Sequence, residues 1–201
     1  MAENEPTNEP AKRYHHGDLR EALVAAGRTL LEEKGWRGFT LRECARRASV
    51  SHAAPAHHFA SLDDLLAEIA RRGFVELEAA MAAEATRSDR KPTAQLVGQC
   101  VGYMAFAAAN PMMFELMFHR TADRKGPPAF ATAIAAVIPQ AAPEVQAQMV
   151  DFAWSTVHGF ITLVLEGWIG ANDSSSNLKA RSLATLGAMV ETVVRTGGAP
   201  D

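Results

Sequence analysis

From Phe39 to Phe59 the sequence reads FTLRECARRASVSHAAPAHHF, and this segment carries the strongest local signals of the chain. Thr40 is followed three residues later by Glu43, which is the spacing of a capping box at a helix start. Apolar residues then recur at three- and four-residue spacing and predict one buried face, while the arginines fall on the other faces. The apolar set is Leu41, Cys44, Ala45 and Ala48, and the arginines expected to be free for solvent or phosphate are Arg42, Arg46 and Arg47. We therefore predict a short helix that begins at Thr40.

A turn and a second helix follow directly. Ser49-Val50-Ser51 predicts the turn, with Val50 as an apolar plug between the helices and Ser51 as a second N-cap. The second helix is expected from His52 to about Phe59. Pro55 lies at the edge of its first turn, where a missing N–H costs little, although it also leaves open a start one residue later. This order of elements is that of a helix-turn-helix.

In a helix-turn-helix, the N-terminal part of the second helix enters the major groove of DNA. Small alanines let that helix approach closely and can contact thymine methyl groups, while a histidine donates or accepts according to its tautomer. We expect His52, Ala53 and Ala54 to meet base edges and the neighbouring polar residues to lie nearer phosphates. The full predicted DNA-binding set is Lys12, Arg13, Thr40, Arg42, Ser51, His52, Ala53, Ala54, His57 and His58. The alternative is a pair of short packed helices without a DNA role.

The charge of the chain is unevenly distributed. The 201 residues are 48% hydrophobic and 21% charged, which suffices for one or two domains with a true core. A formal net charge of -3 argues against general binding of polyanions. Residues 12–60 nevertheless carry nine Lys and Arg against five Asp and Glu, whereas residues 61–201 carry eleven against fifteen. The basic share therefore lies on the predicted DNA-binding module.

The sequence predicts a cytoplasmic protein. No apolar run approaches the roughly 18 to 20 residues that span a bilayer, and the first residues are acidic and polar. The two cysteines, Cys44 and Cys100, are far apart on predicted helices and form neither a CxxC motif nor a disulfide framework. We expect both to be buried as small apolar side chains, with a redox-sensing thiol at Cys100 as the alternative.

Helical periodicity recurs along the whole chain and strand alternation does not, so we predict an all-α fold. An N-terminal three-helix helix-turn-helix domain is followed by a C-terminal helical domain for ligand binding and dimerisation. The expected division is 1–13 as a disordered acidic tail and basic arm, 14–75 as the first domain and 76–201 as the second. Helices are expected up to Lys34, over 61–86, 92–109, 111–119, 128–139 and 143–170, and, after a loop over 172–177, to about 196.

The last two long helices suggest a dimer. On the final helix, Leu183, Leu186, Val190 and Val193 form a narrow seam. The helix before it has two adjacent apolar stripes, so it is apolar over too much of its circumference for one buried face. The first stripe is Ala153, Val157, Phe160, Val164 and Gly167, and the second is Trp154, His158, Ile161, Leu165 and Trp168. We expect one stripe to meet its own domain and the other a second copy, the alternative being a helix buried inside a monomer.

Two segments resemble a known family. The segment from Tyr14, YHHGDLREALVAAGRTLLEEKGWRGFTLRECARRASVSHAAPAHHFASLDDLLAEIA, closely resembles the DNA-binding domain of TetR-family (tetracycline-repressor-like) transcriptional regulators. AWSTVHGFITLVLEG, with Trp154, His158 and Gly159, resembles the signature of a C-terminal ligand-binding class of that family with a Trp-His-Gly motif. The resemblance implies a homodimeric repressor that binds a palindromic DNA operator and is released by a small, mostly apolar effector.

The chain departs from the family pattern at two positions. Ala56 occupies a place where the family commonly has Tyr, and Leu62 one where it usually has Lys. Both family residues typically touch phosphate, and phosphate contacts supply much of the salt-dependent affinity for DNA. We therefore expect weaker binding, or a greater share for Arg42, Lys12 and Arg13. A dimeric ligand-sequestering or protein-interaction protein with a weakened helix-turn-helix is the alternative function.

The region after the first domain is rich in methionine and aromatic residues, which suit an adaptable apolar pocket. The predicted ligand-binding residues are Tyr103, Met104, Met113, Phe114, Met117, His119, Trp154 and His158, of which the tyrosine and the two histidines are the expected polar contacts. A purely structural role in the core is the alternative for each. No phosphate-cradling glycine loop, nucleophile elbow or HExxH motif occurs, and adjacent histidines do not make a metal site. We predict no enzyme activity, no cofactor and no metal.

Overall fold

The computed structural model describes residues 16–120 and 127–198, so the predicted arm residues Lys12 and Arg13 lie outside the described residues. The described residues form α-helices and one 3-10 helix, as the all-α prediction requires. Two compact units are present, residues 1–65 and 66–201. Helix α3 crosses from one unit into the other, and the predicted domain boundary at residue 75 stays a prediction.

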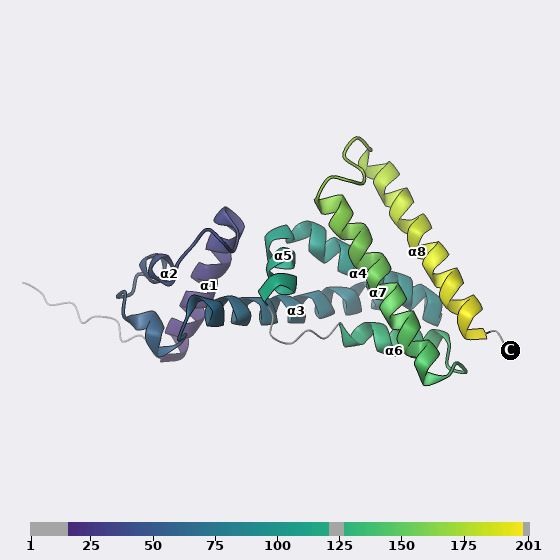
Figure 1. The fold of residues 1–201 in the computed structure, drawn as a ribbon, viewed down its shortest axis with the longest axis horizontal. Coiled ribbons are helices and arrows are strands. Elements are labelled where there is room, and N and C mark those ends of the chain that lie inside the picture. Colours follow the sequence, from purple (N-terminus) through teal and green to yellow (C-terminus); the bar gives the residue numbers. More distant parts are fainter. Residues whose placement is uncertain (1–15, 121–126, 199–201) are drawn as a thin grey trace, which may run out of the picture. The chain divides into compact units, whose positions relative to one another are not determined.

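The first unit contains α1 (His16–Lys34), α2 (Leu41–Arg47) and the 3-10 helix η1 (Ala54–His57), followed by the start of α3 (Leu62–Arg87) (Figure 1). The predicted end of the first helix at Lys34 is confirmed. The core of the first unit forms where the apolar faces of these elements pack together. Its buried side chains include Leu23, Leu30, Phe39, Cys44, Ala45, Phe59 and Leu65.

The second unit is built from the rest of α3 and five further helices: α4 (Pro92–Ala109), α5 (Pro111–Arg120), α6 (Pro128–Val137), α7 (Pro143–Leu165) and α8 (Ser175–Gly198). In Figure 1, α7 and α8 run side by side in opposite directions. Helix α4 approaches α3 closely, because a Cβ built at Gly102 would lie only 2.5 Å from the carbonyl oxygen of Ala80. Among the described helices, none is long and apolar enough to cross a membrane.

Two predicted boundaries in this unit were wrong. Helix α7 ends at Leu165 rather than near residue 170, because Gly167 adopts a φ of 77° and Trp168 N–H donates to the Leu163 carbonyl at 2.8 Å. This is the closing pattern of a helix C-terminus. Helix α8 begins inside the predicted loop, because the Ser174 hydroxyl accepts a hydrogen bond of 3.3 Å from the N–H of Asn177 and caps the helix.

The predicted apolar stripes of the last two helices also need correction. On α7 the buried residues are Ala153, Val157 and Ile161, which come from both stripes. On α8 three seam residues are buried, but Leu183 is 46% exposed. Large apolar side chains left exposed on or near these two helices are Phe152, Leu163, Leu165, Trp168, Leu183 and Val194. The outward apolar surface is therefore different from either predicted stripe.

Candidate nucleic-acid interface and ligand cavity

The first helix of the predicted helix-turn-helix begins as expected. Thr40 is the N-cap of α2, and its hydroxyl accepts a 3.3 Å hydrogen bond from the N–H of Glu43. The reciprocal half of the capping box is replaced, since the Glu43 carboxylate pairs with Lys34. A complete capping box does form at Ser61 and Asp64, with bonds of 2.9 and 3.1 Å, and it starts α3 as predicted.

The turn after α2 closes with a full Schellman motif. The N–H of Val50 donates to the Ala45 carbonyl at 3.0 Å, and that of Ser49 donates to the Arg46 carbonyl at 3.2 Å. Ser49 adopts a φ of 57°, a left-handed conformation that usually favours glycine. The predicted turn at Ser49 is confirmed, and its backbone geometry is fixed by two hydrogen bonds.

The second helix of the motif differs from the prediction. The segment from His52 to Phe59 is a turn followed by η1, a single piece of 3-10 helix. Pro55 cannot donate a hydrogen bond, and so short a segment returns too few bonds to offset the cost of nucleating an α-helix. Ser51 does not cap η1 through its side chain, because the N-cap is Ala53 and its start carries no side-chain hydrogen bond.

This segment nevertheless presents small and polar side chains outward from a buried base. Pro55 and Phe59 are buried, and the guanidinium of Arg20 lies 5.1 Å from the centre of the Phe59 ring. The predicted residues Ala54 and His58 are half-buried. The exposed residues of the segment are Ser51, His52, Ala53, Ala56 and His57. Four of the six residues predicted here to contact DNA are therefore accessible.

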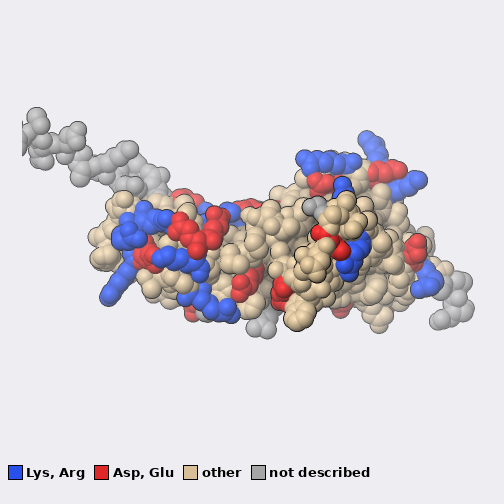
Figure 2. Space-filling view, turned by 90° about the horizontal axis from the view of Figure 1, so that it is seen from above, with Lys and Arg blue, Asp and Glu red and all other residues tan. Residues whose placement is uncertain are grey.

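The arginines of α2 do not share one role. Arg47 forms a two-bond ion pair with Glu33 at 2.6 and 2.7 Å, which contradicts the prediction that it is free. The hydrogen bond and charge of Arg47 lower the pKa of Glu33. Arg42 and Arg46 are exposed, and neither makes an ion pair within the described part of the chain. Figure 2 shows charges of both signs interspersed over this unit.

The second unit has a partly open cavity of about 450 Å³ between α5 and the C-terminal half of α7. Its lining residues are Pro111, Met112, Phe114, Glu115, Phe118, His119, His158, Thr162, Leu165 and Glu166. The wall is mostly apolar and aromatic, with a few polar groups, which is the usual make-up of a small-molecule site. A smaller cavity of about 140 Å³ is lined in part by Trp154.

A partly buried chain of hydrogen bonds leads to the wall of the larger cavity. The indole N–H of Trp154 donates to the Tyr103 hydroxyl at 3.3 Å, and that hydroxyl lies 2.8 Å from Nδ1 of His158. The Tyr103 side chain is fully buried. Burial raises the pKa of Tyr103, although the hydrogen bond from Trp154 opposes this effect, and burial lowers the pKa of His158. Both side chains are therefore neutral near pH 7.

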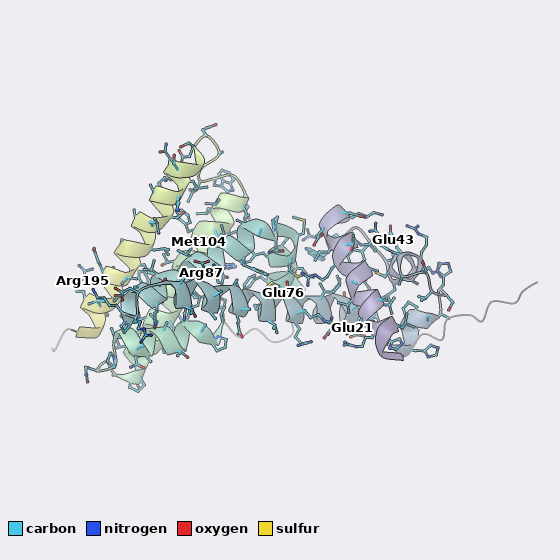
Figure 3. The ribbon with its side chains drawn as sticks, turned by 180° about the vertical axis from the view of Figure 1, so that it is seen from behind. Glu21, Glu43, Glu76, Arg87, Met104 and Arg195 are labelled. Atoms are coloured by element: carbon cyan, nitrogen blue, oxygen red, sulfur yellow. The ribbon has the colours of Figure 1, made fainter. Side chains whose placement is uncertain are left out.

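The predicted ligand-binding residues occupy three different places. Phe114, His119 and His158 line the larger cavity, and Tyr103 and Trp154 reach it through His158. Met113 and Met117 contact α3 at Gly73, where a Cβ would lie 2.9 and 2.7 Å from their sulfur atoms. Met104 is half-buried on α4 (Figure 3). The sequence also offered Met112 and Phe118 as candidates, and both line the cavity, whereas Thr162 and Glu166 were not selected.

The cysteines behave as buried side chains. Both Cys44 and Cys100 are fully buried and free, as predicted. Burial raises the pKa of Cys100 to about 12 and that of Cys44 to about 11. A thiol protonated at neutral pH is a poor nucleophile, so the redox-sensor alternative for Cys100 gains no support.

A helix-turn-helix unit followed by a helical unit with an apolar cavity is the architecture of a class of DNA-binding regulators. A family model described as bacterial regulatory proteins, tetR family, matches residues 23–69. A second model, described as tetracyclin repressor-like, C-terminal domain, matches residues 96–186. The chain belongs to the TetR family of DNA-binding transcriptional regulators.

Solved structures share the fold over nearly the whole chain. A protein of unknown function from Rhodococcus sp. RHA1 is 27% identical, with a TM-score of 0.71 over 92% of this chain and 98% of its own. TetR from Acinetobacter baumannii AYE is 16% identical, with a TM-score of 0.68 over 91% and 98%. A variant of that TetR in complex with minocycline is 17% identical, with a TM-score of 0.66 over 93% and 100%. No curated protein matches.

Proposed function

We propose that the protein is a cytoplasmic repressor that binds a palindromic DNA operator as a homodimer and is released by a small, mostly apolar effector. The observation that carries the proposal is the exposed row of small and polar side chains over η1, held by a buried apolar base. Ala53 and Ala56 leave room for close approach to base edges, and His52 supplies a hydrogen-bonding group. Ser51, Thr40 and Arg42 are proposed to contact phosphates.

The proposed dimer rests on the apolar surface of α7 and α8. Phe152 and Leu163 are exposed on α7, and Leu183 and Val194 on α8. Such a surface is costly to leave in water and is typical of an interface between copies. Two copies related by a two-fold axis would present two reading segments, which suits a palindromic site with half-sites about 34 to 36 Å apart.

The effector is proposed to occupy the cavity beside α5. Phe114 and Phe118 of α5 line the cavity, while Met113 and Met117 of the same helix contact α3 at Gly73. A ligand that displaces α5 would therefore act on α3, the helix that continues from the first unit into the second. A typical coupling of about 1 to 3 kcal/mol would change operator affinity by several-fold to over a hundredfold. His158, which lines this cavity, also supports membership of the Trp-His-Gly class.

Selection of random duplex DNA by the purified full-length protein tests the proposal. A palindromic consensus, bound far more tightly than random DNA, is expected. No enrichment, or binding that only follows salt concentration, would contradict operator recognition. That result would favour the sequestering alternative, in which Ala56 and the half-buried Leu62 mark a weakened helix-turn-helix.

The variant Ala56→Tyr sharpens this test. A phenol at this exposed position would supply a phosphate contact, so several-fold tighter binding to the selected duplex is expected. Ala60→Tyr, at an exposed position just beyond the reading segment, is the matched control and should leave the affinity unchanged. Equal effects of the two substitutions would argue against DNA contact at residue 56.

A further inference from the structure

The wall of the cavity contributed by α7 holds a polar atom that no described protein group satisfies. The Thr162 hydroxyl oxygen is buried and has no hydrogen-bond partner among the described residues. His158 precedes it by four residues, so both side chains lie on the same face of α7, and both line the cavity. Buried polar atoms normally find a partner, and a rotation about the Cα–Cβ bond of Thr162 would turn this covered hydroxyl toward a ligand in the cavity.

The hydrogen-bond chain behind this wall fixes the tautomer of His158. An indole N–H can only donate, so the Tyr103 oxygen accepts from Trp154. Among the described residues, Nδ1 of His158, 2.8 Å away, is the acceptor available to the Tyr103 hydroxyl proton, which burial would otherwise leave unsatisfied. A neutral imidazole that accepts at Nδ1 carries its proton on Nε2. His158 therefore has one N–H donor, which bonds to no described protein group.

The remaining lining sets the shape and charge of a suitable ligand. The rings of Phe114 and Phe118 lie 5.3 and 4.5 Å from the His158 ring, measured between centroids, and favour a flat aromatic partner. Glu115 and Glu166 are among the residues that line the same cavity, and no Lys or Arg is among the described lining residues. A negatively charged ligand is disfavoured by this arrangement.

We infer that the cavity binds an uncharged, planar aromatic compound whose carbonyl oxygen accepts one hydrogen bond from Nε2 of His158 and one from the Thr162 hydroxyl. A carbonyl oxygen has two lone pairs and can satisfy both donors at once. The ring system then lies against Phe114 and Phe118. The cavity volume of about 450 Å³ is ample for two fused rings. The regulatory meaning of this site rests on the proposed effector function, whereas its ligand chemistry does not.

Calorimetric titration of the full-length protein with three matched probes tests this ligand chemistry. The probes are 2-acetylnaphthalene, 2-isopropenylnaphthalene, which has the same shape without an acceptor, and 2-naphthoate, which adds a negative charge. The ketone is expected to bind at least about tenfold more tightly than the alkene, and more tightly than the carboxylate. Equal binding of ketone and alkene, a preference for naphthoate, or no measurable binding of the ketone would overturn the inference.

Variants of the two hydrogen-bond donors, His158 and Thr162, test whether they bind the carbonyl oxygen of the ketone. Thr162→Val keeps the side-chain shape and should reduce the ketone-to-alkene preference several-fold, whereas Thr162→Ser should retain it. His158→Phe should bring the preference close to one, and the exposed Ser155→Ala on α7 is the control. An unchanged preference in both Thr162→Val and His158→Phe would place the carbonyl elsewhere and overturn the inference.

Addition of the ketone to the complex with the selected duplex separates the two proposals. Preferential binding of the ketone without any change in DNA affinity would keep the ligand chemistry and contradict the proposed effector role. Intact operator binding by a protein that shows no preference for the ketone would keep the proposed DNA-binding function and contradict the inferred ligand chemistry.

Discussion

Surface ion pairs occur in both units of this protein, but among the described residues the hydrogen-bond chain that starts from a fully buried side chain lies in the second unit. In the first unit, the ion pair of Arg47 with Glu33 and that of Lys34 with Glu43 lie at the surface. In the second unit, Tyr103 is fully buried and carries a hydrogen-bond chain into the protein interior. Surface pairs are screened by salt and are individually weak, whereas a buried chain depends on every member being satisfied.

The two units should therefore be sensitive to different changes. The first unit should tolerate most surface substitutions, and its interaction with DNA should respond to salt. The second unit should respond to changes of volume, to the loss of one hydrogen-bonding group and to protonation. The predictions below test that division, beginning with the largest effect.

Gly102→Leu should lower the free energy of unfolding by about 3 kcal/mol, because a side chain at this position meets the backbone of α3 at Ala80. Ala105→Leu, at an exposed position of the same helix, is the control and should change stability by less than about 0.5 kcal/mol. Urea unfolding of both variants measures the difference. Similar values for the two would show that α3 and α4 do not pack as closely as described.

Tyr103→Phe should destabilise the protein by about 1 to 3 kcal/mol, because it leaves the buried groups of Trp154 and His158 without their shared partner. Glu33→Gln, which weakens the exposed pair with Arg47, should destabilise the protein much less. Thermal unfolding in low and high salt compares them, and only the second loss should shrink with salt. A larger loss for Glu33→Gln would contradict the division between the units.

Acidification should destabilise the second unit through His158. Burial lowers the pKa of His158, so the folded protein binds its proton less readily than the unfolded chain does. Stability is therefore unaffected well above the unfolded pKa of about 6.5 and falls as the pH drops below that value. His158→Phe should flatten the pH dependence of the melting temperature between pH 7.5 and 5.5. An unaltered pH dependence in this variant would assign the effect to other groups.

Ser49→Gly should stabilise the protein by about 1 kcal/mol, because glycine adopts the observed positive φ without the steric cost that a side chain carries. Ala48→Gly, one residue earlier at a φ of -76°, should instead be neutral or destabilising. Urea unfolding checks both. A loss of stability in Ser49→Gly would show that the serine side chain contributes more than the backbone strain costs.

Much of the fold was predictable because local signals set the helix starts. The starts of the helices at Pro92, Pro111, Pro128 and Pro143 were all predicted, since proline suits the first helical turn. The cap at Thr40 and the capping box at Ser61 follow from residues three apart in sequence. These features depend on neighbours along the chain, and so the sequence displays them.

Features that depend on tertiary contacts were missed or wrong. Nothing local distinguishes Arg47, which pairs with Glu33 fourteen residues away, from Arg42. The cavity brings together α5 and α7, so Thr162 drew no attention as one threonine within an apolar helix. The segment around Pro55 has a helical pattern, but its length favours a 3-10 turn. The predicted burial of the seam and stripes on the last two helices was wrong in part, because periodicity does not show which neighbouring helix covers a face.

We expect DNA binding to depend on surface charges of the first unit and ligand binding on buried groups of the second. The slope of affinity against salt for the selected duplex tests this division. Arg42→Gln should make the plot of log affinity against log salt less steep by about 0.9, the effect of one lost phosphate contact. Thr162→Val should leave that slope unchanged. A slope that Arg42→Gln leaves unchanged, or that changes equally in both variants, would contradict this division between the units.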